Sequence, residues 1–140
     1  MPLPSADGVG RDARHLLGQA LVAMIATEQP DGRPHLTPIW FSWDGATFEV
    51  LTPPSSRKYQ NLARRPRCTI SVDDRTWPYQ SLTAECDVAA TRDECGYPET
   101  LVRRYLTDDL AAAFLDSYGD TALIAVTLRP TRWYGYNIPG

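Results

Sequence analysis

The chain has 140 residues, a length typical of one domain, and we predict a single domain over residues 1–140. Hydrophobic residues make up 43% of it, charged residues 22%, and the formal net charge is −3; this balance indicates a globular protein and argues against a general binder of nucleic acid or of acidic membranes. No apolar run reaches the length of a membrane span, no signal-peptide pattern opens the chain, and the three cysteines contain no CxxC pair, so we predict a cytoplasmic protein that binds neither membrane nor nucleic acid.

Two β-hairpins are predicted in the first half of the chain, after a short helix at 11–18. The turn signals are Pro-Asp-Gly and Asp-Gly, at 30–32 and 44–45. The apolar segments around them predict three strands, at 20–28, 35–43 and 46–52. Because such short turns join antiparallel neighbours, we expect the three strands to form a meander.

One helix is predicted after the third strand, in the segment "RKYQNLARR", with Ser55 or Ser56 as its N-cap. The remaining elements are two strands with alternating apolar residues, a pair of helices and a last apolar strand, at 67–73, 80–91, 98–118 and 121–130. An aromatic tail then leads to the end of the chain.

The count is about six strands, mostly joined by hairpins, with one helix after the third strand and a helical pair before the last. This order predicts a mainly β fold with peripheral helices, namely a small six-stranded antiparallel barrel. A parallel βαβ sheet is disfavoured, because the first three strands are joined by turns that are too short for crossover connections.

The stretch "TPPSSRKYQNLARRP", residues 52–66, is the most informative local feature. It contains Lys58, the single lysine in a chain that has thirteen arginines. The first amides of a helix are unpaired and carry the positive end of the helix dipole, so they favour an anion. Two serines, Arg57 and Lys58 add directed donors at the same corner. We interpret this corner as a phosphate site; the alternative is a capped surface helix whose cations are solvated.

Other polar groups give weaker signals. His35 and Thr37 lie on one face of the second predicted strand, but no metal-binding set accompanies them, so we expect no metal, and His35 alone fits a structural role. No Ser/His/Asp order with an elbow motif occurs, which disfavours nucleophilic hydrolysis. The basic run "LARRPR" fits a solvated helix end. The sequence assigns no catalytic acid or base.

Aromatic residues gather outside the predicted core. Trp77 and Tyr79 fall in a loop, and Trp133, Tyr134 and Tyr136 fall in the tail. Flat side chains in such segments close over a planar ligand or form a dimer interface. Both roles hold if the ligand lies at that interface.

Several sequence marks occur together in one known family. They are "DGRPH", then P-x-W-F, then S-x-K with N-L and R-x-P-R after it, and "VDD" followed by "PY". In this order and spacing the chain resembles the pyridoxamine 5'-phosphate oxidase-like split β-barrel flavoproteins and, within them, the deazaflavin-dependent (coenzyme F420) reductases. The resemblance covers nearly the whole chain.

The resemblance implies a six-stranded split β-barrel that forms a homodimer, with two cofactor sites at the interface. It implies coenzyme F420 as the cofactor, or alternatively FMN. The resemblance also implies three sets of cofactor-binding residues. Beside the ring, on the second strand, are His35, Thr37 and Pro38. Around the phosphate are Thr52, Ser55, Ser56, Arg57, Lys58 and Asn61, and the second subunit contributes Trp77, Tyr79 and Trp133.

Two features depart from the family pattern. Cys86 follows Glu85 where the family has a glycine, a residue that eases the close approach of a backbone or a ligand. The helical segment from Cys95 to Asp116 is also less typical, and we expect it to reshape the substrate pocket.

These inferences predict an oxidoreductase in which a bound deazaflavin passes a hydride to a small unsaturated or carbonyl-conjugated organic substrate. One alternative is an FMN-dependent oxidoreductase of the same fold. Another is a non-catalytic carrier of a flavin, a deazaflavin or haem. A dimerisation module without a cofactor is a third.

Overall fold

The computed structural model describes residues 11–136, with side chains from residue 15 onward. The predicted lead-in at 1–10 and the end of the aromatic tail, 137–140, lie outside the described residues. Within the described range, four helices and seven strands follow one another in the order α1 (Arg11–Gly18), β1 (Ala23–Glu28), β2 (Pro34–Ile39), β3 (Ser42–Trp43), β4 (Phe48–Thr52), α2 (Arg57–Arg64), β5 (Arg67–Asp74), β6 (Gln80–Cys95), α3 (Glu99–Tyr105), α4 (Asp108–Tyr118) and β7 (Ala122–Tyr136).

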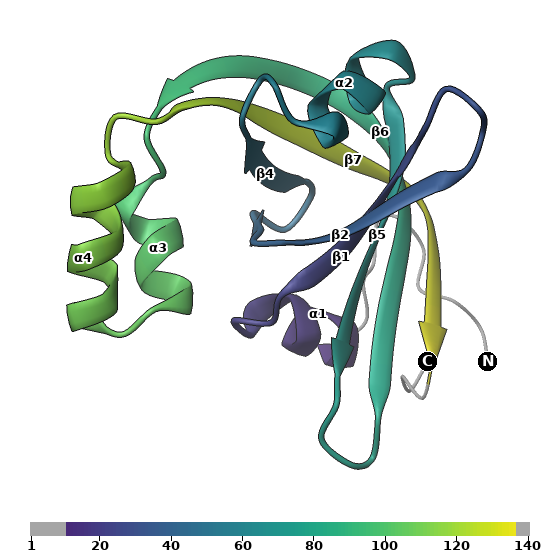
Figure 1. Cartoon of the computed structure of the whole chain (residues 1–140). Coiled ribbons are helices and arrows are strands. Elements are labelled where there is room, and N and C mark those ends of the chain that lie inside the picture. The colour runs from purple at the N-terminus through teal and green to yellow at the C-terminus, as the bar shows by residue number, and fades with distance from the viewer. Residues whose placement is uncertain (1–10, 137–140) are drawn as a thin grey trace.

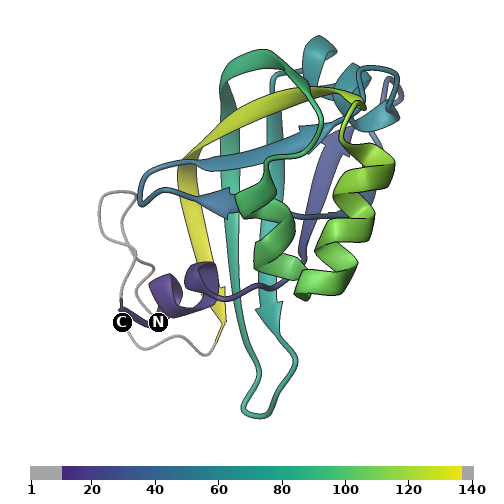
Figure 2. The same cartoon turned by 90° about the vertical axis from the view of Figure 1, so that its left-hand side faces the viewer.

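All of these strands join one antiparallel sheet in the order β2-β1-β5-β6-β7-β4-β3. β6 and β7 are the longest, and they curve together across the molecule (Figure 1). The α3–α4 pair connects the end of β6 to the start of β7, and Figure 2 shows it in front of the sheet. The predicted fold class, a mainly β antiparallel barrel with peripheral helices, is confirmed.

The predicted single strand at 35–43 is wrong, and so is the predicted meander. β2 pairs with β1, whereas β3 pairs with β4 at the opposite edge of the sheet. The chain leaves strand geometry at Trp40 and Phe41, where the hydroxyl of Tyr105 lies 3.2 Å from both the amide nitrogen and the carbonyl oxygen of Phe41. A side chain thus takes up the backbone groups that a neighbouring strand would otherwise bind. This break also raises the strand count from the predicted six to seven.

Local signals predicted most of the other boundaries. Both hairpin turns are confirmed, and Gly45 of the second has a positive φ of 99° that favours glycine. Ser56 rather than Ser55 caps α2. β6 and β7 extend beyond their predicted ends because they pair with each other through almost their whole length, so β7 takes in the aromatic residues up to Tyr136.

The core lies on the inner face of the sheet. Most of the alternating residues that the sequence predicts to share a face of β5 and β6 are buried there: Cys68, Ile70, Val72, Leu82, Ala84 and Cys86. The same pattern also places Val88 and Ala90 on this face, but Val88 is half-buried and Ala90 is exposed, and the strand register shifts between them. Leu16 and Leu17 of α1 and Leu62 of α2 pack against them. Cys86 lies directly opposite Cys68 in the β5–β6 register, so its side chain belongs to the core.

The prediction that Trp133 lies in a tail outside the core is wrong. Trp133 pairs with the buried Ala84 across β6 and β7, and this register places its side chain on the inner face. The side chain is 2% exposed, and its indole packs edge-on against Trp43 with ring centroids 5.7 Å apart. Trp133 is therefore a core residue.

Candidate cofactor-binding site

The corner between β4 and α2 is held in place by Thr52 and Ser56. The Ser56 hydroxyl oxygen accepts a hydrogen bond from the Tyr59 amide (3.1 Å) and lies 2.7 Å from the hydroxyl of the buried Thr52. The Ser56 amide donates to the carbonyl oxygen of Pro53 (3.0 Å). The helix offers no internal acceptor to the amides of Arg57 and Lys58, and these have no hydrogen-bond partner among the described residues. The corner therefore presents fixed, free donors.

Arg57 and Lys58 are the only cations among residues 15–136 whose side chains make neither an ion pair nor a hydrogen bond. Each of the other arginines in this range has at least one such partner: Arg33, Arg64, Arg65, Arg67, Arg75, Arg92, Arg103, Arg104, Arg129 and Arg132. Partial burial lowers the pKa of Lys58 below its usual value, because the charged ammonium loses hydration without gaining a counter-charge. This corner thus carries two uncompensated positive charges.

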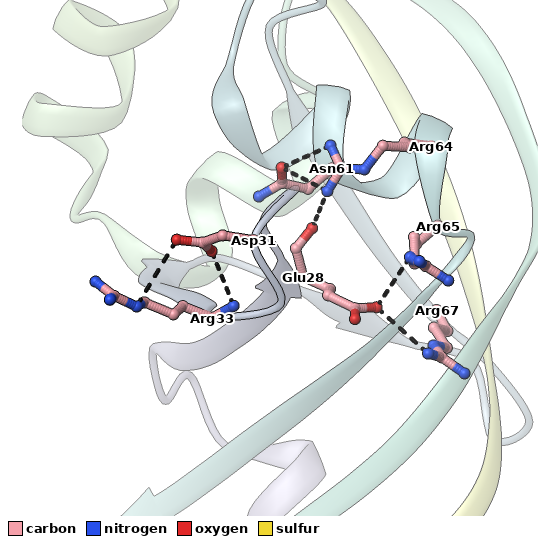
Figure 3. A network of polar contacts seen from close by, with 7 residues as sticks. All are labelled: Glu28, Asp31, Arg33, Asn61, Arg64, Arg65 and Arg67. Carbon is pink, nitrogen blue, oxygen red and sulfur yellow. Dashed lines mark hydrogen bonds and ion pairs between the residues drawn. The ribbon is translucent and has the colours of Figure 1, made fainter.

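The basic run at the other end of α2 is paired. Arg65 and Arg67 lie 3.4 Å and 3.3 Å from the Glu28 carboxylate, and Arg64 donates to the Glu28 carbonyl oxygen (Figure 3). In the same view Asp31 and Arg33 form a separate pair in the β1–β2 turn. The helix end that the sequence predicted to be merely solvated is exposed, but its arginines are held against β1. These cations are less available to an anion than Arg57 and Lys58.

A cavity of about 310 Å³ opens beside the corner. Lys58 and Thr52 of the corner line it, and no carboxylate does. The lining residues come from β2, β4 and their flanking segments, the start of α2, and the region of α3 and α4: Val22, Pro38, Ile39, Trp40, Leu51, Thr52, Pro53, Lys58, Tyr97, Leu101 and Phe114. Such a lining suits a ligand with an anionic group at one end and a flat, apolar group at the other.

A second hollow, of about 460 Å³, lies over β1, β5 and β6. Its charged groups are already paired: Arg67 with Glu28 at 3.3 Å, and Asp87 with Arg129 at 3.6 Å. Although this hollow is larger, it offers no free cation among the described residues. The smaller cavity beside Lys58 is therefore the better candidate for an anionic cofactor.

Two buried polar atoms of β2, Nδ1 of His35 and Oγ1 of Thr37, have no hydrogen-bond partner among the described residues. Alternation places both side chains on the same face of the strand as Ile39, which lines the cavity. Buried polar atoms are nearly always satisfied in proteins. A bound group that supplied the missing partners would account for both of them.

The structure brings many of the predicted site residues together. Pro38, Thr52 and Lys58 line the cavity, and Ser55, Ser56 and Arg57 form the adjoining corner. Asn61 is 2% exposed and is used internally, since its side-chain amide donates to the Thr27 hydroxyl (3.0 Å). It does not line the cavity, so within one chain it positions α2 against β1.

Three predicted residues lie elsewhere in the chain. Trp77 and Tyr79 are 78% and 51% exposed and pack edge-on at 5.2 Å in the loop that joins β5 to β6. This loop and α2 lie at opposite ends of the molecule in Figure 1. Trp133, as described above, is enclosed in the core and displays no surface to a ligand.

Sequence reasoning missed several lining residues, notably Trp40, Tyr97 and Phe114. Trp40 belongs to the P-x-W-F motif and could have been found from it. Tyr97 and Phe114 come from the atypical helical segment, and no local pattern indicates that this segment folds back onto Trp40.

Among the described residues, no group of three or more histidine, cysteine, aspartate or glutamate side chains is placed to hold a metal ion. Within residues 11–136, no helix is long and apolar enough to span a bilayer. The family model described as pyridoxamine 5'-phosphate oxidase matches residues 10–137. The chain belongs to this family. Its barrel is thus the split β-barrel of the pyridoxamine 5'-phosphate oxidase family, whose members bind flavin-type cofactors.

Solved structures of similar proteins agree with this assignment. An F420 reductase is 27% identical, with a TM-score of 0.69, and the match covers 86% of this chain and 94% of that one. A conserved hypothetical protein from Mycobacterium tuberculosis is 24% identical, with a TM-score of 0.62 and coverage of 98% and 94%. An FAD-binding protein from Mesorhizobium loti is 14% identical, with a TM-score of 0.61 and coverage of 89% of both chains. The last two show likeness of fold alone. A search of curated proteins found no significant match.

Proposed function

We propose that this member of the pyridoxamine 5'-phosphate oxidase family is an oxidoreductase that uses coenzyme F420 to reduce a small unsaturated or conjugated organic substrate. The observation that carries the proposal is the pair of uncompensated cations, Arg57 and Lys58, at the start of α2 beside an apolar cavity. Similarity to an F420 reductase, at 27% identity over 86% of the chain, supports the deazaflavin in particular.

In this proposal the corner holds the cofactor phosphate. Lys58 and Arg57 supply the charge, and the free amides of the first turn of α2 supply directed hydrogen bonds. Thr52, Ser55 and Ser56 complete the corner, while His35, Thr37 and Pro38 lie along the ring. The unsatisfied atoms of His35 and Thr37 support this placement, because a polar ring edge would give them partners.

When bound in its reduced form, the cofactor supplies the hydride. The protein's own residues bind and orient it and exclude water. The apolar lining of the cavity by Ile39, Leu51 and Leu101 suits that last task, because it keeps polar solvent away from the reacting groups.

We further propose that two chains share each site in a cytoplasmic homodimer. The cavity of one chain, about 310 Å³, lies at the low end of the range for ligand pockets. The exposed Trp77 and Tyr79 would cover the ring bound by a partner chain. All three cysteines are free thiols, in keeping with a reducing compartment.

The test is a parallel fluorescence titration with coenzyme F420 and with FMN, followed by an acceptor screen with the cofactor that binds more tightly. We expect the deazaflavin to bind more tightly and its reduced form to be oxidised faster with an acceptor than in free solution. Tight binding without accelerated oxidation would identify a carrier, and binding of neither cofactor would remove the proposal.

The shared site is tested separately with the double variant Trp77→Ala/Tyr79→Ala. We expect it to shift the protein towards monomer in analytical ultracentrifugation and to lose cofactor affinity in parallel. A monomer that binds the cofactor as the native protein does would refute the shared site and leave the phosphate corner standing.

A further inference from the structure

The segment between β6 and β7, residues 96–121, forms one wall of the cavity; we call it the β6–β7 insert. It contains α3 and α4 and contributes Tyr97, Leu101 and Phe114 to the lining. Figure 2 shows both helices side by side in front of the sheet. What this wall presents to the cavity therefore bears directly on which substrates fit.

Polar contacts fix the β6–β7 insert to the rest of the chain. The Tyr105 hydroxyl donates to the Leu21 carbonyl oxygen (2.9 Å), and Arg104 donates to the carbonyl oxygens of Leu17 and Gln19 (2.9 Å and 2.6 Å). At its base, Gly96 has a φ of 80° and packs so closely on Gly119 that a Cβ would lie 2.1 Å from the Gly119 carbonyl oxygen. The wall is thus anchored at its base and along α3.

Four rings of this region lock one another in place. Trp40 stacks on Tyr105, with centroids 5.0 Å apart and an angle of 3° between the rings, and lies 5.3 Å from Phe114. Tyr97 packs edge-on against both Trp40 (6.5 Å) and Phe114 (5.2 Å). Rings held in this way give the cavity flat surfaces of fixed orientation, which suit a planar ligand.

The Tyr97 hydroxyl is the unusual polar group in this aromatic part of the lining. It has no hydrogen-bond partner among residues 15–136, whereas the Thr52 hydroxyl already binds Ser56. Burial raises the pKa of Tyr97, and the neighbouring Tyr118 raises it further, so the phenol stays protonated at neutral pH and remains a donor. A ligand oxygen that accepts this hydrogen bond would be recognised directly.

We propose that Tyr97 orients the substrate by donating a hydrogen bond to an uncharged acceptor oxygen, and that Trp40 and Phe114 form the flat walls that position the substrate for this bond. The inference rests on the proposed function, because it names the residues that position the substrate in the same cavity. A carboxylate beside these rings would lose its hydration for a single hydrogen bond, so acids are disfavoured at this end of the cavity.

The test compares Tyr97→Phe with the matched control Tyr118→Phe. Tyr118 packs on Phe114 at 4.8 Å but does not line the cavity. Each ¹⁵N-labelled protein, free of cofactor, is titrated with coumarin, a flat conjugated carbonyl compound, and with indole, a flat bicycle without an acceptor oxygen. The indole N–H signal of Trp40 reports binding. We expect Tyr97→Phe to weaken coumarin binding about two- to tenfold, the range of one net hydrogen bond.

Tyr97→Phe should bind indole with native affinity, and Tyr118→Phe should bind both compounds with native affinity. Equal coumarin affinity in Tyr97→Phe, or a Trp40 signal that coumarin leaves unmoved, would overturn the inference. In the cofactor-loaded enzyme, Tyr97→Phe should raise KM for a conjugated ketone more than it lowers kcat.

The two levels of the proposal fail separately. Coumarin binding that depends on Tyr97, in a protein that reduces no acceptor, would refute the proposed function alone. Reduction of conjugated ketones at native rates and native KM by Tyr97→Phe would refute the role of Tyr97 alone.

Discussion

Replacing Lys58 with methionine tests the phosphate corner most directly. Methionine keeps most of the unbranched apolar stem and removes the ammonium, so packing is largely preserved while the charge is lost. Because Lys58 has no other partner among the described residues, the loss is confined to its contact with the bound phosphate. One charge-assisted hydrogen bond contributes about 1.5–3 kcal/mol. We therefore expect Kd for the cofactor to rise about 10- to 150-fold.

Fluorescence titration of the cofactor measures this change. Arg33→Met is the matched control, because it removes the same charge from a side chain that is 83% exposed in the β1–β2 turn. It should change Kd by less than a factor of two. If Lys58→Met binds the cofactor as tightly as the control does, Lys58 does not contact the phosphate and the argument from uncompensated charge is wrong.

In the cofactor-free protein the same substitution should be favourable, because it should raise the free energy of unfolding. Burial lowers the pKa of Lys58 in the folded state below the value of 10.5 expected in the unfolded state. Below the folded pKa the charged ammonium therefore costs native stability in full, and the cost disappears as the pH rises towards 10.5. Lys58→Met should be more stable than the native protein in urea at neutral pH. The gap should narrow towards high pH; a less stable variant at pH 7 would contradict this.

Three further predictions concern the scaffold, each checked by urea denaturation at equilibrium. Trp133→Ala should lower the free energy of unfolding by about 3–5 kcal/mol, as for a large core side chain, and a change below 1 kcal/mol would contradict its placement. Tyr105→Phe should cost about 1–3 kcal/mol, since it leaves backbone groups of Leu21 and Phe41 without their partner; native stability would show that they do not depend on it. Cys86→Gly should destabilise by about 2 kcal/mol, because it removes a buried side chain and adds backbone entropy to the unfolded chain, and a stabilised variant would refute the core role of Cys86.

The elements that could be predicted from the sequence depend on residues close together in the chain. Ser56 caps α2 through the amide of Tyr59, three positions on, and the turn at Gly45 is decided by its own φ. The alternation along β5 likewise needs no distant information. The phosphate corner was proposed for the same reason, because Ser56, Arg57 and Lys58 are consecutive.

The features that could not be predicted depend on contacts between distant segments. The break at Phe41 involves the hydroxyl of Tyr105, 64 positions along the chain. Trp133 is in the core because β7 continues far enough to pair it with Ala84, and strand length is set by the partner strand rather than by local composition. Tyr97 and Phe114 reach the cavity only because the β6–β7 insert packs against Trp40, which is distant from it in the sequence.

The two ends of the cavity are encoded by separate stretches of the sequence. Residues 52–58 form the cationic part of the lining and its adjoining corner, whereas residues 97–114 contribute to the aromatic part. The latter join the barrel through the tips of its two longest strands. Replacing the helical pair between Cys95 and Ala122 with another segment would leave residues 52–58 unchanged. The substrate selectivity of this scaffold could therefore be engineered by exchanging one contiguous segment, the β6–β7 insert, while the phosphate corner stays the same.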